Sequence, residues 1–280
     1  MSGSTSIFKR TLTSPSGLIG LVILVLILCM AMSATELFPK GPWSMVARPY
    51  IWPGKNLKVP LGTDVLGRDM LAGIFYGARV SLLVGFVAAS AALLIGVTVG
   101  ALSGYYGRIV DTVLMRITDA FQTIPSFLFA IVIVAILSPS ITTIVCAIAL
   151  VSWPSIARLM RAEVLRVREM EFVQSCKVIG MSDARIILTQ VIPNSLSPVI
   201  VAASVLVATA IITEAGLAFL GLGDPNIMSW GSIINVGRPS IRTSWYIALI
   251  PGGFVVLTVL ALNLLGDAIN DAINPRLRRR

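Results

Sequence analysis

Residues able to do covalent or metal chemistry are few in this 280-residue chain, and they lie far apart. There is no His, and the three cysteines, Cys29, Cys146 and Cys176, do not have the spacing of a zinc site or a disulfide framework. The Gly-x4-Gly-Lys-[Ser/Thr] loop that holds nucleotide phosphates is absent, as are the Gly-x-Ser-x-Gly elbow and the His-Glu-x-x-His helix. We therefore expect no catalytic residue, no metal and no cofactor in this chain.

The composition is that of a protein embedded in a lipid bilayer. Hydrophobic residues make up 56% of the chain and charged residues 12%, with a mean hydropathy of +0.90. Soluble domains carry about 25% charged residues. The apolar residues form long runs, whereas an outer-membrane barrel has alternating segments of about ten residues. The composition therefore predicts an all-α membrane protein.

Charge-free segments predict six spanning helices. A hydrocarbon core about 30 Å thick requires roughly 20 apolar residues per helix. The long interval between Asp119 and Arg158 is divided into two spans by the turn signal at 138–140. The predicted spans are 17–35, 80–102, 120–137, 140–157, 191–213 and 243–266, the last five lying in a core of residues 80–280. We expect no ionisable residue within any of them.

Lys and Arg predict the orientation, because they concentrate in cytoplasmic loops. With residues 1–16 inside, fourteen of the 22 basic residues lie on the cytoplasmic side, which favours an N-in, C-in protein of the bacterial inner membrane. This bias explains the net charge of +9 without a nucleic-acid partner. Alternatively, the first span is a cleaved signal peptide, since Lys9 and Arg10 precede it and small residues end it. Cleavage would leave the orientation of the later segments unchanged.

Two outer segments, 36–79 and 214–242, have readable patterns. In the first, Thr63 or Asp64 can cap a helix. The apolar residues of that helix recur every three or four positions, at Leu66, Met70 and Ile74. The pattern predicts an amphipathic helix on the outer surface, with Asp64 and Arg68 as a surface ion pair. The second segment is rich in Gly, which allows close packing on neighbouring helices.

The longest inner segment, 158–190, is typical of a helix, a glycine turn and a second helix. One face of the first helix is apolar, formed by Phe172, Cys176 and Ile179. Gly180 ends this helix, and Ser182 with Asp183 can begin the next. Two interpretations remain open: a helix pair on the membrane surface, and a docking surface for a cytoplasmic partner. Because ion-coupled transporters keep an ionisable residue in the bilayer, a transporter of this composition most simply takes its energy from a partner docked here.

This inner segment resembles the Glu-Ala-Ala motif of ABC-transporter permeases. The resemblance covers Gln174-Ser175-Cys176-Lys177-Val178-Ile179-Gly180 and, nine residues later, Gln190-Val191-Ile192-Pro193. Gly180 and Pro193 match, whereas the departures from the family pattern are at Gln174, Ser175, Cys176, Gln190 and Ile192. Other blocks resemble the second permease subunit of dipeptide, oligopeptide and nickel importers: 61–69 with 76–82, 214–223 with 229–231, and 263–276.

The resemblance implies a type I importer permease with six spans. It implies a heterodimer with a sister permease, two cytoplasmic ATPases that bind the ATP, and a periplasmic or lipid-anchored substrate-binding protein. By position, the residues that would contact an ATPase are Phe172, Gln174, Ser175, Cys176, Lys177, Gly180, Met181, Ser182, Asp183 and Arg185. Those that would face the binding protein are Asp64, Arg68, Asp69 and Trp230.

The sequence indicates the transport mechanism more clearly than it indicates the cargo. The resemblance favours di- and oligopeptides, with nickel or another small solute as the alternative. From a different class, an ATP-independent secondary transporter or channel would need no ATPase. Copurification of a sister permease and ATPases would separate these classes.

Overall fold

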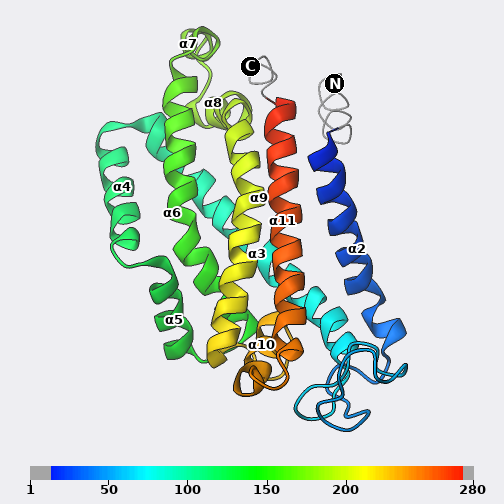
Figure 1. Ribbon diagram of the computed structural model, residues 1–280. Coiled ribbons are helices and arrows are strands. Elements are labelled where there is room, and N and C mark those ends of the chain that lie inside the picture. Colours follow the sequence, from blue (N-terminus) through cyan, green and yellow to red (C-terminus); the bar gives the residue numbers. More distant parts are fainter. Residues whose placement is uncertain (1–13, 274–280) are drawn as a thin grey trace.

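The computed structural model describes residues 14–273, which form a bundle of long helices (Figure 1). In chain order the helices are α2 (Pro15–Leu37), α3 (Met70–Tyr106), α4 (Arg108–Gln122), α5 (Ser126–Leu137), α6 (Ile141–Arg168), α7 (Glu171–Val178), α8 (Asp183–Ile186), α9 (Ile192–Leu217), α10 (Trp230–Gly237) and α11 (Tyr246–Ile273). Two π-helical segments, η1 (Ile187–Val191) and η2 (Ala218–Leu222), extend α9, and a 3-10 turn, η3 (Arg238–Ser240), follows α10. Lys9, Arg10 and the end of the 263–276 block lie outside the described residues.

Five helical segments are long and apolar enough to cross a membrane. They are Pro15–Leu37, Met70–Tyr106, Ile141–Arg168, Asp183–Leu222 and Tyr246–Ile273. Helices α4 and α5 meet the same criterion only together, as a pair bent by 80°, and with that pair the count is six. The predicted all-α membrane fold is confirmed.

The predicted continuous span 120–137 is wrong, because it is broken between α4 and α5. Pro125 lies at the break, immediately before α5. Proline has no N–H to donate and disfavours helical backbone at the residue before it. At the other end of α5, Ser138 has a φ of 71° and Ser140 caps α6. The predicted turn at 138–140 is thus confirmed.

The predicted amphipathic surface helix is also wrong, since Met70 and Ile74 belong to the first turns of α3 and Leu66 lies in the loop before it. Asp69, rather than Thr63 or Asp64, caps this helix, and its carboxylate accepts a backbone N–H at 2.9 Å. Met70 and Ile74 are buried against residues of α10. No proline interrupts the chain up to the end of α3, so one helix of 37 residues forms.

Predicted spans 17–35, 80–102 and 191–213 lie within longer helical segments. Spans 140–157 and 243–266 begin one and three residues before helices that continue past their predicted ends. The helices can be longer because charged side chains near helix ends can reach water. Helix α6 continues past residue 157 to Arg168, so the predicted inner segment 158–190 begins as the end of a long helix. Helix α9 includes Glu214, which is only 2% exposed. The predicted spans themselves contain no Asp, Glu, Lys, Arg or His, but Glu214 lies one residue beyond the predicted span 191–213 and inside the longer helix α9.

Helices α3 and α6 approach closely along a row of glycines. Gly96, Gly100 and Gly104 of α3 are one turn apart on one face. A Cβ on Gly100 would lie 2.4 Å from the carbonyl oxygen of Ala157 on α6. Added Cβ atoms on the other two glycines would lie 2.8 and 2.9 Å from carbonyl oxygens of α6. Only glycine permits this spacing between the two helices.

We expect Gly100→Val to destabilise the fold by about 1–3 kcal/mol, the range for overpacking a close contact. The added side chain would force α3 away from α6. Thermal unfolding in detergent would measure the effect. Gly252→Val in α11 is the matched control, because a Cβ there meets no atom within 4 Å. Equal melting temperatures for the two variants would contradict a glycine-dependent α3–α6 contact.

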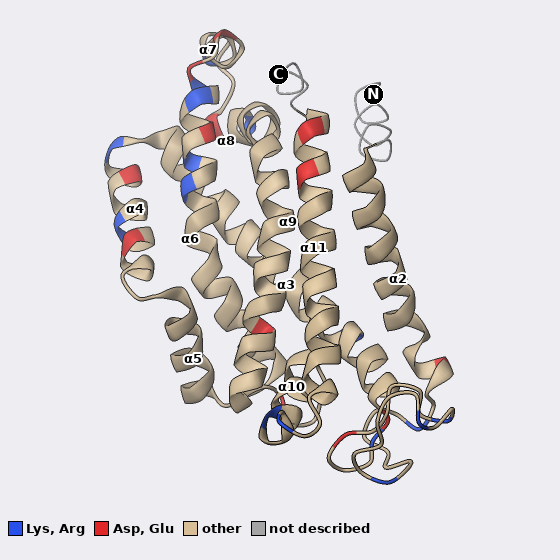
Figure 2. Ribbon diagram, in the orientation of Figure 1, with Lys and Arg blue, Asp and Glu red and all other residues tan. Residues whose placement is uncertain are grey.

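The two ends of the bundle carry different features. The start of α2, the end of α11 and the pair α7–α8 lie at one end, called the inner end below (Figure 1). The loop of residues 38–69 and α10 lie at the other, called the outer end. Charged residues concentrate at the two ends and on α4 (Figure 2). This arrangement agrees with the predicted N-in, C-in topology.

Candidate functional site

Helix α7 forms the tip of the inner end, and α8 lies below it beside the start of α9 (Figure 1). Helix α7 ends in a Schellman motif, in which the Met181 N–H donates to the Cys176 carbonyl oxygen at 3.1 Å and the Gly180 N–H donates to that of Lys177 at 3.0 Å. Gly180 has a φ of 84°, which glycine adopts without strain. Helix α8 then begins at Asp183. The predicted order of helix, glycine turn and helix is confirmed.

An apolar underside attaches this helix pair to α6. Val173 of α7 and Ile186 of α8 are fully buried. They share one cluster with residues of α6, including Met160, Val164 and Val167. Because the underside is packed against a long helix, the pair has a defined position relative to the bundle.

The predicted apolar face of α7 is not the face that the bundle buries. Val173 occupies the buried position, Cys176 is half-buried, and Phe172 and Ile179 are exposed. Helix α7 has only 8 residues. The apolar residues at 172, 173, 176, 178 and 179 are compatible with more than one buried face. Packing against α6 selects the face that contains Val173.

Polar contacts join the end of α3 to the helix pair and to the end of α6. The Tyr105 hydroxyl donates to Asp183 Oδ1 at 2.7 Å, and Lys177 Nζ lies 5.3 Å from the centre of the Tyr105 ring. Arg168 Nη1 donates to the carbonyl oxygens of Gly104 at 2.8 Å and Tyr105 at 3.3 Å. The sequence reasoning missed Tyr105, because it lies 78 positions from Asp183 and no local pattern indicates the contact.

The outward surface of the helix pair carries an apolar tip, defined as Phe172, Val178 and Ile179. Their exposed fractions are 39%, 88% and 81%. Three large exposed apolar side chains on one short helix and its end make this surface a candidate for binding a partner. Helix α7 also lies beyond the ends of α9 and α11 (Figure 1), which favours a docking surface over a helix pair on the membrane. Val178 and Ile179 were not named among the predicted contact residues, although two apolar residues directly before the turn glycine could have indicated this surface.

The structure places the predicted ATPase-contacting residues on and under this surface. Cys176 and Met181 are half-buried beneath the helix pair. The exposed residues are Phe172, Gln174, Ser175, Lys177, Gly180, Ser182, Asp183 and Arg185. Most of the predicted set is therefore exposed.

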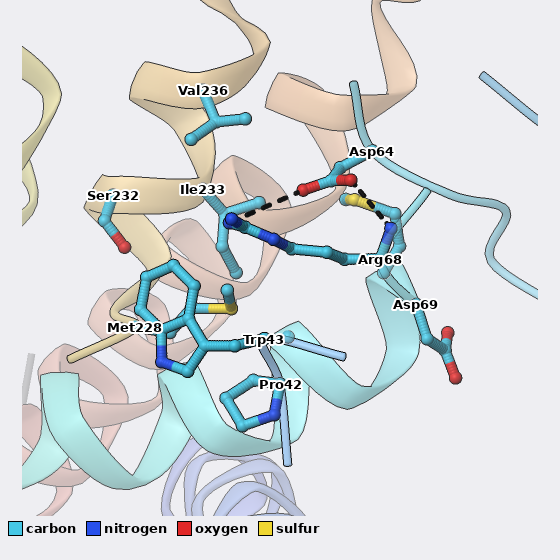
Figure 3. Close-up of a pocket in the computed structure, with 11 residues that line it drawn as sticks. Pro42, Trp43, Asp64, Arg68, Asp69, Met228, Ser232, Ile233 and Val236 are labelled. Carbon is cyan, nitrogen blue, oxygen red and sulfur yellow. Dashed lines mark hydrogen bonds and ion pairs between the residues drawn. The ribbon is translucent and has the colours of Figure 1, made fainter. Parts of the chain in front are cut away.

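Asp64, Arg68 and Asp69 lie together at the outer end, beside α10 (Figure 3). Arg68 Nη1 is 4.0 Å from Asp64 Oδ2, and the two side chains are 16% and 7% exposed, so the predicted surface ion pair is largely buried. The Arg68 guanidinium lies 4.6 Å from the centre of the Trp43 ring. Burial raises the pKa of the Asp69 carboxyl, and two backbone N–H groups of α3 partly oppose this. The cluster braces the outer loop against α10.

Trp230 is fully buried, so its predicted role of facing a binding protein is wrong. Its indole Nε1 donates to the Ile74 carbonyl oxygen at 3.0 Å. Its backbone N–H donates to Ser81 Oγ at 3.4 Å, and that hydroxyl donates to Glu214 Oε2 at 3.1 Å. These contacts attach α10 to α3 and α9, a consequence of tertiary packing that the turn-like sequence around Trp230 did not indicate.

A hollow of about 470 Å³ lies where the α4–α5 bend meets α6 and α9. Its polar lining residues are Gln122, Ser126, Ser152, Ser155, Thr209 and Thr213, and none of its lining residues is charged. Hydroxyl and amide side chains can both donate hydrogen bonds to a peptide group and accept them from it, and they carry no charge that would bind an ion strongly. Within residues 14–273, no group of three or more His, Cys, Asp or Glu is placed to hold a metal ion. The sequence reasoning found none of this lining, because distant segments contribute it.

Comparisons with known proteins agree with these features. A family model described as "Binding-protein-dependent transport system inner membrane component" matches residues 96–279, which include the helix pair and the hollow. The dipeptide transport system permease protein DppC of Alkalihalophilus pseudofirmus is 39% identical, over 97% of this chain and 89% of that protein. The oligopeptide transport system permease protein OppC of Bacillus subtilis is 34% identical, over 94% of this chain and 86% of that protein.

A solved structure has the same fold. It is an inward-facing form of the MetNI methionine ABC transporter, with a TM-score of 0.61 and 19% identity. The match covers 73% of this chain and 97% of the other. At this identity the likeness concerns the fold alone.

Proposed function

This chain belongs to the family of binding-protein-dependent transport system inner membrane components, and from that premise we propose that it carries di- or oligopeptides across the inner membrane. It is a permease subunit of an ABC importer and works with ATPase subunits and a substrate-binding protein. It is not itself the subunit that hydrolyses ATP. In our proposal ATP is bound by the partner ATPases alone, and this chain holds no cofactor.

The apolar tip of the helix pair carries the proposal. A tip of three exposed apolar side chains stands on a pair whose underside is packed on α6 and whose polar contacts reach α3. A partner that encloses the tip would bury this apolar surface, which stabilises the contact. Movement of that partner would then be passed to the long helices. This is the arrangement that ATP-driven alternating access needs.

We propose that a sister permease covers the hollow at the α4–α5 bend. Six of the lining residues are polar, and the hollow lies between helices that span the membrane or form the bent pair. The hydroxyls of Ser155, Thr209 and Thr213 donate to backbone carbonyl oxygens, whereas the side chains of Gln122, Ser126 and Ser152 have no hydrogen bond within residues 14–273. Polar groups that face hydrocarbon without partners are unfavourable. A second permease chain on this face would shield the polar lining from lipid and complete a water-accessible path between the two subunits.

The same lining supports peptides as cargo. Serine and threonine hydroxyls and the Gln122 amide can exchange hydrogen bonds with peptide groups, which every peptide carries regardless of its side chains. The nickel alternative has less support, because imidazole is a favoured nickel ligand and the chain contains no His. Relatives named for dipeptide and oligopeptide transport support the same choice.

Transport by the complex in proteoliposomes tests the proposal. We expect a labelled dipeptide to accumulate when the permease, its partner subunits, the binding protein and ATP are all present. Omission of ATP or of the binding protein should abolish accumulation, and Ni²⁺ supplied instead of peptide should not accumulate. Peptide movement by this chain without an ATPase would overturn the proposal in favour of a secondary transporter or channel.

A further inference from the structure

Tyr105 lies at the inner end and contacts the helix pair, although it is not part of the docking surface. It lies one residue before the end of α3, is 7% exposed, and belongs to the same buried cluster as Val173 and Ile186. Its hydroxyl donates to Asp183 Oδ1, at the first residue of α8. Its ring faces Lys177 of α7. One side chain of α3 therefore contacts both helices of the pair.

The Tyr105–Asp183 hydrogen bond is distinct among the contacts of the pair. Between Ser14 and Ile273, it is the one side-chain hydrogen bond that joins α3 to the pair α7–α8. The Arg168 contacts fasten the end of α6 to backbone oxygens of α3, so they do not involve the pair itself. A hydrogen bond has a preferred direction, whereas apolar packing allows sliding. This bond is thus suited to fixing the position of α8 relative to α3.

Helix α3 continues from this contact to the outer end. Its 37 residues correspond to a length of roughly 55 Å at about 1.5 Å per residue. The glycine row keeps it tightly against α6, and near its other end the Ile74 carbonyl oxygen and the Ser81 hydroxyl bind Trp230 of α10. Displacement of α8 would be passed through Tyr105 to α3, whose first turns bind Trp230 of α10.

We propose that Tyr105 is a positioning residue that couples movement of the helix pair to α3, and through α3 to α10 and the outer loop. The proposal rests on the proposed function, because it assumes an ATPase that moves the helix pair. Tyr105 touches neither nucleotide nor cargo in this role. Its effect is on how much transport each hydrolysed ATP produces.

The test is the number of ATP molecules hydrolysed per peptide transported, measured in proteoliposomes with Tyr105→Phe. The ring and the packing stay, and Asp183 is exposed enough to be solvated. Losing a hydrogen bond to a charged group shifts the equilibrium between the coupled and uncoupled positions of α8 by at least about tenfold. We therefore expect the ratio of ATP hydrolysed to peptide transported to rise by a similar factor, while the complex still assembles and hydrolyses ATP. Tyr106→Phe is the matched control, because Tyr106 is its neighbour and is 47% exposed. The control should keep the wild-type ratio.

Asp183→Ala supplies a second measurement, since an exposed residue can be replaced without disturbing the core. We expect this variant to raise the ratio, and the double variant with Tyr105→Phe to be no worse than the more affected single variant. A wild-type ratio in Tyr105→Phe, or loss of assembly in both variants at an unchanged ratio, would overturn the positioning role. A wild-type complex that shows no ATP-driven uptake would overturn the proposed function and this inference together.

Discussion

Gly180→Arg is expected to abolish ATP-driven uptake while the protein remains inserted and folded. An added Cβ at Gly180 meets no atom within 4 Å, so the bundle can accommodate the side chain. The φ of 84° imposes a strain of about 1–2 kcal/mol, confined to an exposed turn. The arginine would instead project beside the apolar tip and carry an unpaired charge into the contact with the ATPase. Loss of 2 kcal/mol or more at such a contact weakens binding by at least about thirtyfold.

Peptide uptake and copurification of the ATPases would measure this effect. Gly54→Arg is the matched control, because Gly54 has a φ of 80° and equally open surroundings but lies in the outer loop. It should carry the same backbone strain and retain the ATPases. Normal uptake and ATPase retention in Gly180→Arg would show that the glycine turn does not enter an ATPase cleft.

Trp230→Ala is expected to lower the stability of the fold by about 3–5 kcal/mol, the usual cost of removing a buried tryptophan. Trp230 is fully buried, and it packs so closely that a Cβ on Gly77 would lie 2.7 Å from its ring. The substitution would also leave the Ile74 carbonyl oxygen without the indole N–H. Because α10 is attached to α3 through this residue, the outer end should loosen first.

Thermal unfolding in detergent should show a fall of roughly 10 °C for Trp230→Ala. Trp230→Phe keeps an aromatic ring and loses the donor, so we expect an intermediate melting temperature. Trp43→Ala is the comparison for a tryptophan of the same outer end, because Trp43 is 41% exposed. If Trp230→Ala melts no lower than Trp43→Ala, burial of Trp230 does not hold α10 in place.

The helix pair shows how far local sequence predicts structure. The Gly180 turn and the start of α8 at Asp183 were predicted, since both depend on backbone preferences of a few adjacent residues. The apolar face that the sequence indicated on α7 is not the face that the structure buries. With 8 residues, α7 is too short for periodicity to select a face, and contact with α6 selects it.

The outer end shows a second kind of error. The spacing of Leu66, Met70 and Ile74 fits a helix on the surface as well as it fits the start of a buried helix. Trp230 likewise suits a membrane interface by composition. The structure buries Met70, Ile74 and Trp230 together because α10 packs back against α3. A contact between residues so far apart in sequence leaves no local pattern.

The sequence by itself determined the class of protein, the approximate spans, the orientation favoured by Lys and Arg, and the family through its motifs. Those properties follow from hydrophobicity, charge and local backbone preference, which act along the chain. The break at Pro125 follows from local backbone preference, although it was not predicted from the sequence. Tertiary structure alone decided the burial of Glu214 and Trp230, the hydroxyl-lined hollow and the Tyr105–Asp183 contact. Each of these depends on which helices become neighbours, and packing between distant segments determines that choice.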